Sequence, residues 1–398
     1  MSQIILGDVH LGKSLSIGRI GIGSNLNSRV ADQLNLLDWT LDLAVERGSD
    51  HIIITGDVFE DPRPNPQLIT IFIAWLKKCQ AYNIHIHIIM GNHDLYRSGA
   101  VFVSSLDIIS EMDLDNVSVY KDINTIMIGS SAFTLVPFRD RKSFGTASNA
   151  EALTMLRDSL IYELAAIPVT YKKVLIGHLA IEGSIPIGDE IDDVTNELFC
   201  PVSMFTGYDY VWMGHVHKPQ IMKKSNPYVA HIGSMDISNF GETDHKKHIV
   251  IFDETSANDY TIEYLPTRSL RKLLVSVPKD IVDTTEYVLD FLKKENEDLN
   301  KAIVKVEITL TDPELKSINK ASIEKFLATQ GVFNVAGISE SKKVSLIKKD
   351  INNTIDTKMD VNSAIKTYAQ TYVDEPVREA FIELALEIYN EYKIEAKE

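Results

Sequence analysis

Short apolar runs alternate with longer amphipathic stretches along the first 265 residues. The apolar runs are rich in Ile and Val, which is typical of strands buried on both faces. They predict strands at residues 3–6, 51–55, 84–90, 173–176, 210–213 and 248–253. Apolar residues at helical spacing predict helices at residues 29–47, 67–82, 104–112 and 150–164. This alternation of strands and helices indicates a layered α/β domain.

The pattern changes after residue 265. It predicts a compact α+β module with strands at residues 273–277, 302–310 and 332–338 and helices at residues 284–294 and 320–331. A polar stretch at residues 349–356 is typical of a linker. Two helices are expected after it, capped by Asp360 and Asp374, and the second has an apolar stripe beside a ridge of glutamates. We therefore expect three parts, at residues 1–265, 266–345 and 346–398.

Length, cysteine content and charge narrow the possible functions. A chain of 398 residues exceeds the usual size of one hydrophobic core. Cys79 and Cys200 are too few for a disulfide framework or a cysteine zinc site, which favours a reducing compartment. The sequence contains no recognisable signal peptide and no apolar run long enough to cross a membrane. The net charge is −16, and residues 1–265 alone carry −13. Because this acidic part repels a phosphate substrate, bound cations would be needed to hold one there.

Five short polar motifs each follow an apolar run. They are Asp8-Val-His10, Gly56-Asp57, Gly91-Asn-His-Asp94, Gly177-His178 and Gly214-His-Val-His217. In layered α/β sheets, ligands bind beyond the carboxyl ends of strands. The positions of the motifs therefore place their polar side chains where a site can form.

The residue types in these motifs favour two metal ions. The candidate ligands are Asp8, His10, Asp57, Asn92, His178, His215 and His217. A mixture of carboxylate, imidazole and amide suits manganese, iron or zinc better than calcium or magnesium. Seven ligands are too many for one tetrahedral ion, whereas two ions with a shared carboxylate would use them all. Glycine precedes the ligand in four motifs, which lets the chain turn sharply and leaves room for metals and substrate.

Together, the five motifs resemble the calcineurin-like metallophosphoesterase superfamily. More narrowly, the chain is similar to the SbcD branch, the nuclease subunits of double-strand-break repair complexes. The narrower resemblance rests on Asp8-Val-His-Leu-Gly12, Gly56-Asp-Val-Phe59, Asp61-Pro-Arg-Pro-Asn-Pro66 and Gly233-Ser-Met-Asp-Ile-Ser-Asn-Phe-Gly-Glu242. It implies an α/β/β/α sandwich over residues 1–265, followed by a small capping domain that helps to hold DNA and a C-terminal helical segment that binds a partner.

The resemblance also implies a role for each candidate residue. One metal would be held by Asp8, His10, Asp57 and His217. The other would be held by Asp57, Asn92, His178 and His215, so that Asp57 bridges the pair. His93 would contact the phosphate and stabilise the leaving 3′ oxygen. Asp94 would orient His93 by accepting a hydrogen bond from its ring.

The implied activity is a manganese-dependent 3′–5′ exonuclease on double-stranded DNA ends and an endonuclease on single strands, in DNA repair, recombination and replication. The implied partner is an SbcC-type, SMC-like ATPase, bound through residues 351–398. A homodimer through helices of the first domain is expected as well, with Leu37 and Trp39 as candidates. The expected location is the cytoplasm of a bacterial or phage-infected cell.

Two positions depart from the SbcD pattern and leave substrate preference open. Glu60 stands where a histidine is frequent, and Asp236-Ile-Ser replaces an acid–arginine pair. A phosphomonoesterase or a cyclic phosphodiesterase on the same metal centre is the alternative enzyme. A non-catalytic DNA-binding scaffold is a third interpretation, although it has no need for seven ligands. The remaining histidines are expected to be structural: His51, His85, His87, His231, His245 and His248.

Overall fold

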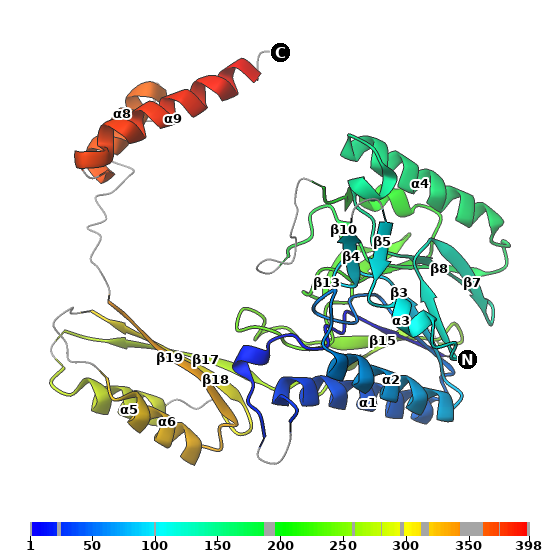
Figure 1. Cartoon of the computed structure of the whole chain (residues 1–398), viewed down its shortest axis with the longest axis horizontal. Coiled ribbons are helices and arrows are strands. Elements are labelled where there is room, and N and C mark those ends of the chain that lie inside the picture. The colour runs from blue at the N-terminus through cyan, green and yellow to red at the C-terminus, as the bar shows by residue number, and fades with distance from the viewer. Residues whose placement is uncertain are drawn as a thin grey trace.

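Two six-stranded sheets pack face to face in the computed structural model (Figure 1). The structure describes residues 2–21, 25–98, 101–186, 196–256, 259–279, 281–294, 298–311, 318–342, 361–373 and 375–395. The first sheet has the order β16-β15-β1-β2-β3-β6. Its strands are β1 (Gln3–Leu6), β2 (His51–Ile54), β3 (His85–Ile89), β6 (Val117–Tyr120), β15 (His248–Phe252) and β16 (Tyr260–Tyr264).

The second sheet has the order β13-β14-β12-β9-β8-β7. Its strands are β7 (Asn124–Ile128), β8 (Ser131–Val136), β9 (Lys172–Gly177), β12 (Tyr210–Met213), β13 (Gln220–Lys224) and β14 (Tyr228–His231). In the first sheet β1, β2, β3 and β6 run parallel, whereas β15 is antiparallel to β1 and β16 is antiparallel to β15. In the second sheet β14, β12, β9 and β8 run parallel, and the edge strands β13 and β7 are antiparallel to their neighbours. Two short pairs complete the domain: β4 (Leu95–Ser98) with β5 (Val101–Ser104), and β10 (Ala180–Ile181) with β11 (Phe199–Cys200).

Apolar side chains hold these layers together. An aliphatic and aromatic cluster that includes Ile5, Ile53, Phe133 and Trp212 fills the space between the sheets. Helices α1 (Ser28–Arg47) and α2 (Pro66–Ala81) cover the outer face of the first sheet, and α4 (Asn149–Ala166) covers the outer face of the second (Figure 1). The predicted α/β/β/α sandwich is thus confirmed.

Local chemistry explains where the two long helices begin and end. The side chain of Asn27 accepts a hydrogen bond from the backbone of Arg29, and Asn65 does the same for the next helix, ahead of Pro66 in its first turn. Gly48 ends α1 in a left-handed conformation. The structure thus bears out the predicted helices at residues 29–47 and 67–82 to within about one residue.

One predicted helix is much shorter than expected. Instead of residues 104–112, α3 spans only Asp107–Ser110. Ser104 belongs to β5, where it pairs with Leu95, and its hydroxyl accepts from the backbone N–H of Leu106. A serine that bonds the backbone in this way favours a turn over a helix interior.

A separate three-stranded parallel sheet follows the sandwich. Its strands are β17 (Leu270–Val277), β18 (Ile303–Leu310) and β19 (Asn334–Lys342), and α5 (Thr284–Lys294) and α6 (Lys320–Thr329) cover one face. Residues alternate between buried and more exposed along β17 and β18, so only one face of this sheet is covered. These elements agree with the strands and helices predicted for residues 273–338.

A buried ion network joins this module to the sandwich. The Arg29 guanidinium, fully buried, donates to Asp32 at 2.8 Å and to Asp236 at 2.5 Å. Arg268, at the entrance to the module, binds both carboxylate oxygens of Asp32 at 2.6 and 2.7 Å. The Asp236 that departs from the SbcD pattern therefore pairs with an arginine supplied by α1.

The last two helices, α8 (Val361–Tyr372) and α9 (Glu375–Glu395), pack against each other. The ring of Tyr368 stacks on that of Phe381 with centroids 6.1 Å apart. The predicted linker at residues 349–356 and the predicted caps Asp360 and Asp374 lie outside the described residues. Among the helices that the structure describes, none is both long and apolar enough to pass through a bilayer.

The ion network predicts a large effect of Asp32→Ala on stability. The change leaves Arg29 buried with one carboxylate fewer, which should lower the free energy of unfolding by about 3 kcal/mol in urea denaturation. Asp38→Ala on the same helix is the matched control, because the ion pair of Asp38 with Lys78 is exposed and should contribute less than about 1 kcal/mol. Equal effects of the two changes would contradict the structural role of the network.

Candidate metal centre

The five motifs meet at the carboxyl ends of neighbouring strands in the two sheets. Both sheets present these ends at one edge of the sandwich, so residues from distant parts of the chain converge there. The candidate ligands follow the strands in this order: Asp8 and His10 after β1, Asp57 after β2, Asn92 after β3, His178 after β9, and His215 and His217 after β12.

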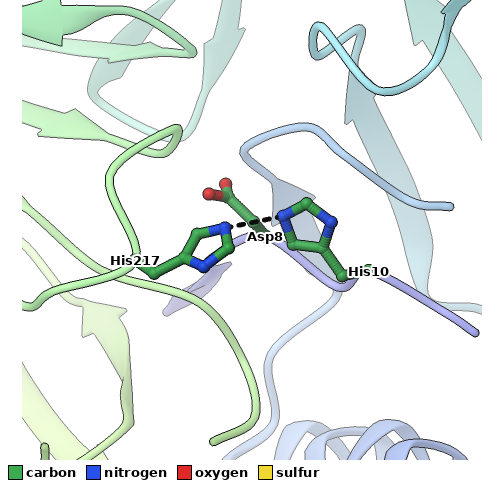
Figure 2. A group of neighbouring side chains, drawn as sticks. All are labelled: Asp8, His10 and His217. Carbon is green, nitrogen blue, oxygen red and sulfur yellow. Dashed lines mark hydrogen bonds between the residues drawn. The ribbon is translucent and has the colours of Figure 1, made fainter. Parts of the chain in front are cut away.

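Asp8, His10 and His217 form the first group (Figure 2). The Nε2 atoms of His10 and His217 face each other at 2.8 Å, and a carboxylate oxygen of Asp8 lies within 4.8 Å of a ring nitrogen of each. All three side chains are buried. The Asp57 Oδ2 atom lies 3.4 Å from the Nε2 atom of His10. The structure thus brings the first predicted ligand set together.

Asp57, Asn92, His178 and His215 form the second group. The Nε2 atom of His178 lies 3.2 Å from Asp57 Oδ2 and 2.9 Å from the side-chain oxygen of Asn92. That same Asn92 oxygen is 3.0 Å from the Nδ1 atom of His215. Because one Asp57 oxygen approaches an imidazole of each group, this carboxylate stands between the two sets.

Each of the four imidazoles turns its other ring nitrogen toward an oxygen atom. At His178 the Thr55 carbonyl oxygen accepts from Nδ1, which turns Nε2 toward the site. The ring nitrogens that face the neighbouring candidate ligands are Nε2 of His10, His178 and His217 and Nδ1 of His215. The outer pairs are His10 with Glu60 at 2.8 Å, His178 with the Thr55 carbonyl at 3.0 Å, His215 with Glu197 at 3.2 Å, and His217 with Glu242 at 3.8 Å.

The charges of the site attract cations. Burial alone would raise the pKa of Asp57, but the imidazoles of His178, His93 and His10 hold it well below its ordinary value. Burial would lower the pKa of His178, yet the carboxylates of Asp57 and Asp8 raise it to about 9. Asp57 therefore stays ionised. It stabilises nearby positive charge, including the proton on His178.

The donor set fits two divalent transition ions. The Nε2 atoms of His10 and His217 lie 2.8 Å apart with the ionised Asp57 alongside, so a cation at this point can draw on both nitrogens and on the carboxylate. The remaining donors are imidazole nitrogens and an amide oxygen, which match the preferences of manganese, iron or zinc.

The backbone is bent sharply to bring these donors together. His10, Asp57 and His215 have φ angles of 46°, 47° and 77°, a left-handed conformation that non-glycine residues rarely adopt. A Cβ atom on Gly214 would lie 2.2 Å from the Oδ1 atom of Asp8, and one on Gly91 would lie 2.1 Å from Asp57 Oδ1. The glycines before the ligands are therefore required by close approach, as the sequence predicted.

His93 and Asp94 lie beside the first group, but their contacts differ from the prediction. The Asp94 carboxylate accepts backbone N–H bonds from Val58 at 3.0 Å, Phe59 at 3.3 Å and Gly91 at 3.0 Å. The expected bond from the His93 ring to Asp94 is therefore wrong. The Nδ1 atom of His93 lies 2.8 Å from the carbonyl oxygen of Glu60 instead. Asp94 shapes the loop in which the His93 ring is held.

The sequence motifs do not reveal the carboxylates that lie beside the imidazoles. Glu60 stands out in the sequence only as a departure from a pattern, yet it pairs with both His10 and Lys13. Burial would raise its pKa, but these neighbours lower the pKa of Glu60 to about 2. Glu197 belongs to no motif, and Glu242 enters only through the resemblance. The buried Lys247 ammonium binds Glu242 at 2.7 Å and donates to the carbonyl of His217, which fixes that loop.

The histidines expected to be structural lie away from the ligand groups. His51 begins β2 and His87 lies in the middle of β3; their rings contact each other at 3.0 Å, and His87 also contacts the hydroxyl of Tyr120. The Nδ1 atom of His231 lies 3.0 Å from the carbonyl oxygen of Gly214. The Leu37 side chain is fully buried in the core, so the prediction that it forms a dimer surface is wrong.

Fold and site together define a class: a layered α/β/β/α phosphoester hydrolase that uses divalent metals. The model of the calcineurin-like phosphoesterase family matches residues 1–219. The chain therefore belongs to this family, which confirms the predicted enzyme class and its need for divalent metal.

Several curated proteins are similar to much of the chain. The SbcD component of nuclease SbcCD from Staphylococcus saprophyticus is 25% identical over 320 residues, which cover 74% of this chain and 76% of that protein. The SbcD component of the same nuclease from Escherichia coli is 26% identical over 257 residues, covering 58% and 62%. DNA double-strand break repair protein Mre11 of Methanopyrus kandleri is 26% identical over 236 residues, covering 56% and 46%.

Among solved structures, the chain is similar to a dimetal phosphatase from Danio rerio. The TM-score is 0.41 at 11% identity, and the match covers 67% of this chain and 96% of that one.

Close packing at the site predicts a severe effect of Gly214→Ala. The new methyl group would overlap the oxygens of Asp8 and Thr55, so Asp8 must move out of the first group. We expect manganese affinity measured by calorimetry to fall at least about tenfold, and the free energy of unfolding to fall by about 2 kcal/mol. Gly337→Ala meets nothing within 4 Å and serves as the control. Unchanged manganese binding in Gly214→Ala would contradict the tight packing around Asp8.

Proposed function

We propose that this protein is the nuclease subunit of a DNA double-strand-break repair complex. It hydrolyses DNA phosphodiesters with two manganese ions, as a 3′–5′ exonuclease on duplex ends and an endonuclease on single strands. The observation that carries the proposal is the convergence of seven ligand-type side chains, with Asp57 between the two groups. The names of the similar proteins, the SbcD component of nuclease SbcCD and the DNA double-strand break repair protein Mre11, support DNA as the substrate.

The two groups of ligands assign the metals. Asp8, His10 and His217 would hold one ion, Asn92, His178 and His215 would hold the other, and Asp57 would bridge them. Such a pair activates a water molecule and neutralises the phosphate oxygens. The Thr55 carbonyl fixes the orientation of the His178 ring, and Glu60, Glu197 and Glu242 lie beside the outer nitrogens of His10, His215 and His217.

His93 is placed to act on the leaving group. Its backbone N–H donates to Asp57 Oδ1 at 2.9 Å, and its Nδ1 atom is engaged by the Glu60 carbonyl. The Nε2 atom is then the one that can give a proton to the departing 3′ oxygen. The ring centroid lies 4.9 Å from that of His10, so His93 borders the first ligand group.

Residues 266–345 would help to hold DNA beside this centre. They form the part of the chain with a small positive net charge, in contrast to the acidic sandwich. Lys272 and Lys305, which share Glu307 as a partner, lie on the uncovered side of the module. Phosphate contacts from such residues fix the position of a duplex without reading its sequence.

The C-terminal helices would bind an SbcC-type ATPase. Val377, Phe381 and Leu384 on α9 are 56%, 38% and 58% exposed, although an isolated helix pair normally covers such side chains. They provide the apolar face that a partner helix or coiled coil can bury. The complex would act in the cytoplasm of a bacterial or phage-infected cell, with a homodimer formed through α1 and α2, to which the half-buried Trp39 contributes.

His93→Ala is expected to separate metal binding from hydrolysis. Manganese stoichiometry should stay at two per chain, whereas cleavage of labelled duplex DNA should fall by about 10²–10⁴-fold, because proton transfer to the leaving oxygen is lost. His85→Ala, in the opposite part of β3, is the control and should keep both properties. A His93→Ala protein with wild-type cleavage would show that the assigned role is wrong.

Activity on three kinds of substrate, each with and without manganese, separates the rival enzyme classes. The wild-type protein should cleave duplex DNA only with manganese and should act poorly on p-nitrophenyl phosphate. Efficient hydrolysis of that monoester without DNA cleavage would support a phosphomonoesterase instead, and turnover of cyclic nucleotides alone would support a cyclic phosphodiesterase.

Deletion of residues 351–398 should separate catalysis from assembly. The shortened protein should retain manganese-dependent nuclease activity because the ligands all lie before residue 218, but it should no longer co-purify with a coiled-coil ATPase. The triple change Val377→Ser, Phe381→Ser and Leu384→Ser tests the apolar face without truncation. Undiminished co-purification of both variants would contradict the assigned docking segment.

A further inference from the structure

A cavity of about 260 Å³ opens directly beside the metal centre. Its walls include the apolar side chains of Met90, Leu95 and Phe138. Lys121 and Arg139 supply cations on its rim, and Asp122 supplies an exposed carboxylate. The cavity therefore combines an apolar interior with donors and an acceptor at the opening, the pattern of a site for a flat polar ring.

The cavity shares a wall with the second ligand group. The ring centroid of Phe138 lies 5.7 Å from that of His215 and 6.3 Å from that of His178. The backbone N–H of Phe138 donates to the Met90 carbonyl at 2.8 Å, directly before the Gly91-Asn92 loop. The Phe138 side chain thus stands between the cavity and the second ligand group.

The rim is held in place by hydrogen bonds. The guanidinium of Arg139 donates to the carbonyl of Phe138 at 2.9 Å, to that of Lys121 at 2.6 Å and to Asp122 at 3.2 Å. The Arg139 side chain is only 14% exposed, so it is a fixed part of the wall. Lys121 pairs with Asp107 at the surface and can turn toward the opening.

We propose that this cavity binds the base of the terminal nucleotide, whose 5′ phosphate lies at the metal centre during hydrolysis. The proposal rests on the proposed nuclease function and deepens it. The ring of Phe138 and the side chains of Met90 and Leu95 offer apolar contact to the flat base, while Lys121, Arg139 and Asp122 can pair with its polar edge. A base in this position has left the duplex stack, which an exonuclease requires at a strand end.

The position of His93 agrees with this assignment. His93 borders the first ligand group, whereas Phe138 borders the second. A strand whose 3′ oxygen departs beside His93 keeps its remaining nucleoside on another side of the phosphate, and the cavity receives that nucleoside. In this arrangement the leaving strand lies beside His93, and the released nucleotide lies in the cavity.

Two p-nitrophenyl diesters test the proposal with the manganese-loaded full chain. Thymidine 5′-(p-nitrophenyl) phosphate and methyl p-nitrophenyl phosphate have the same leaving group and differ only in the nucleoside. Because contact with one base is worth a substantial factor in binding, we expect the nucleoside diester to have a KM at least about fivefold lower. Leu95→Trp, which fills the cavity, should remove this preference, so that the variant has the same KM for both diesters. Lys121→Gln should reduce the preference in part, whereas Lys78→Gln, which also breaks a surface lysine–aspartate pair, should not.

Calorimetry provides a second measurement that does not depend on turnover. Thymidine 5′-monophosphate should bind the wild type at least about fivefold more tightly than deoxyribose 5-phosphate, and Leu95→Trp should bind the two alike. Equal binding of both ligands to the wild type, or a preference unchanged by Leu95→Trp and Lys121→Gln, would overturn the base site. A wild-type protein that prefers thymidine 5′-monophosphate but cleaves neither diester would retain the base site and refute the nuclease function instead.

Discussion

The structure depends on one buried carboxylate that must stay ionised. Asp57 is 1% exposed, and two imidazoles from different groups approach one of its oxygens at 3.4 and 3.2 Å. The other oxygen accepts the backbone N–H of His93 at 2.9 Å. A buried charge is costly unless opposite charge surrounds it. This requirement explains why imidazoles and, by our proposal, two cations gather around Asp57 at one edge of the sandwich.

The fold accommodates the site at the expense of local strain. Three of the seven candidate ligands adopt left-handed φ angles, and Gly91 and Gly214 are pressed against Asp57 and Asp8. Such geometry persists only where surrounding packing enforces it. Here the enforcement comes from the buried strands that precede each motif, with Ile52, Ile54 and Ile88 among the fully buried residues. The packing of the strands therefore maintains the strained backbone geometry of the candidate ligands.

Much of this architecture could be predicted from the sequence, because apolar strands and their polar successors follow simple rules. The strands and helices predicted within residues 273–338 agree with the structure to within a few residues, and so do the predicted strands that correspond to β1, β2, β3 and β15. Strand β8 escapes prediction because Ser131 and Thr134 interrupt its apolar run. Thr134 is fully buried, and its hydroxyl lies within hydrogen-bond distance of Thr125 and Tyr208. The orientation of Asp94 and the outer role of Glu197 depend on how loops turn in space, which spacing along the chain does not encode.

The central claim is that two cations share Asp57. Anomalous diffraction from crystals of the full chain grown with manganese, recorded at the manganese absorption edge, tests this claim most directly. We predict two peaks about 3.5–4 Å apart with Asp57 between them, one beside Asp8, His10 and His217 and the other beside Asn92, His178 and His215. One peak, or two peaks that do not share Asp57, would contradict it.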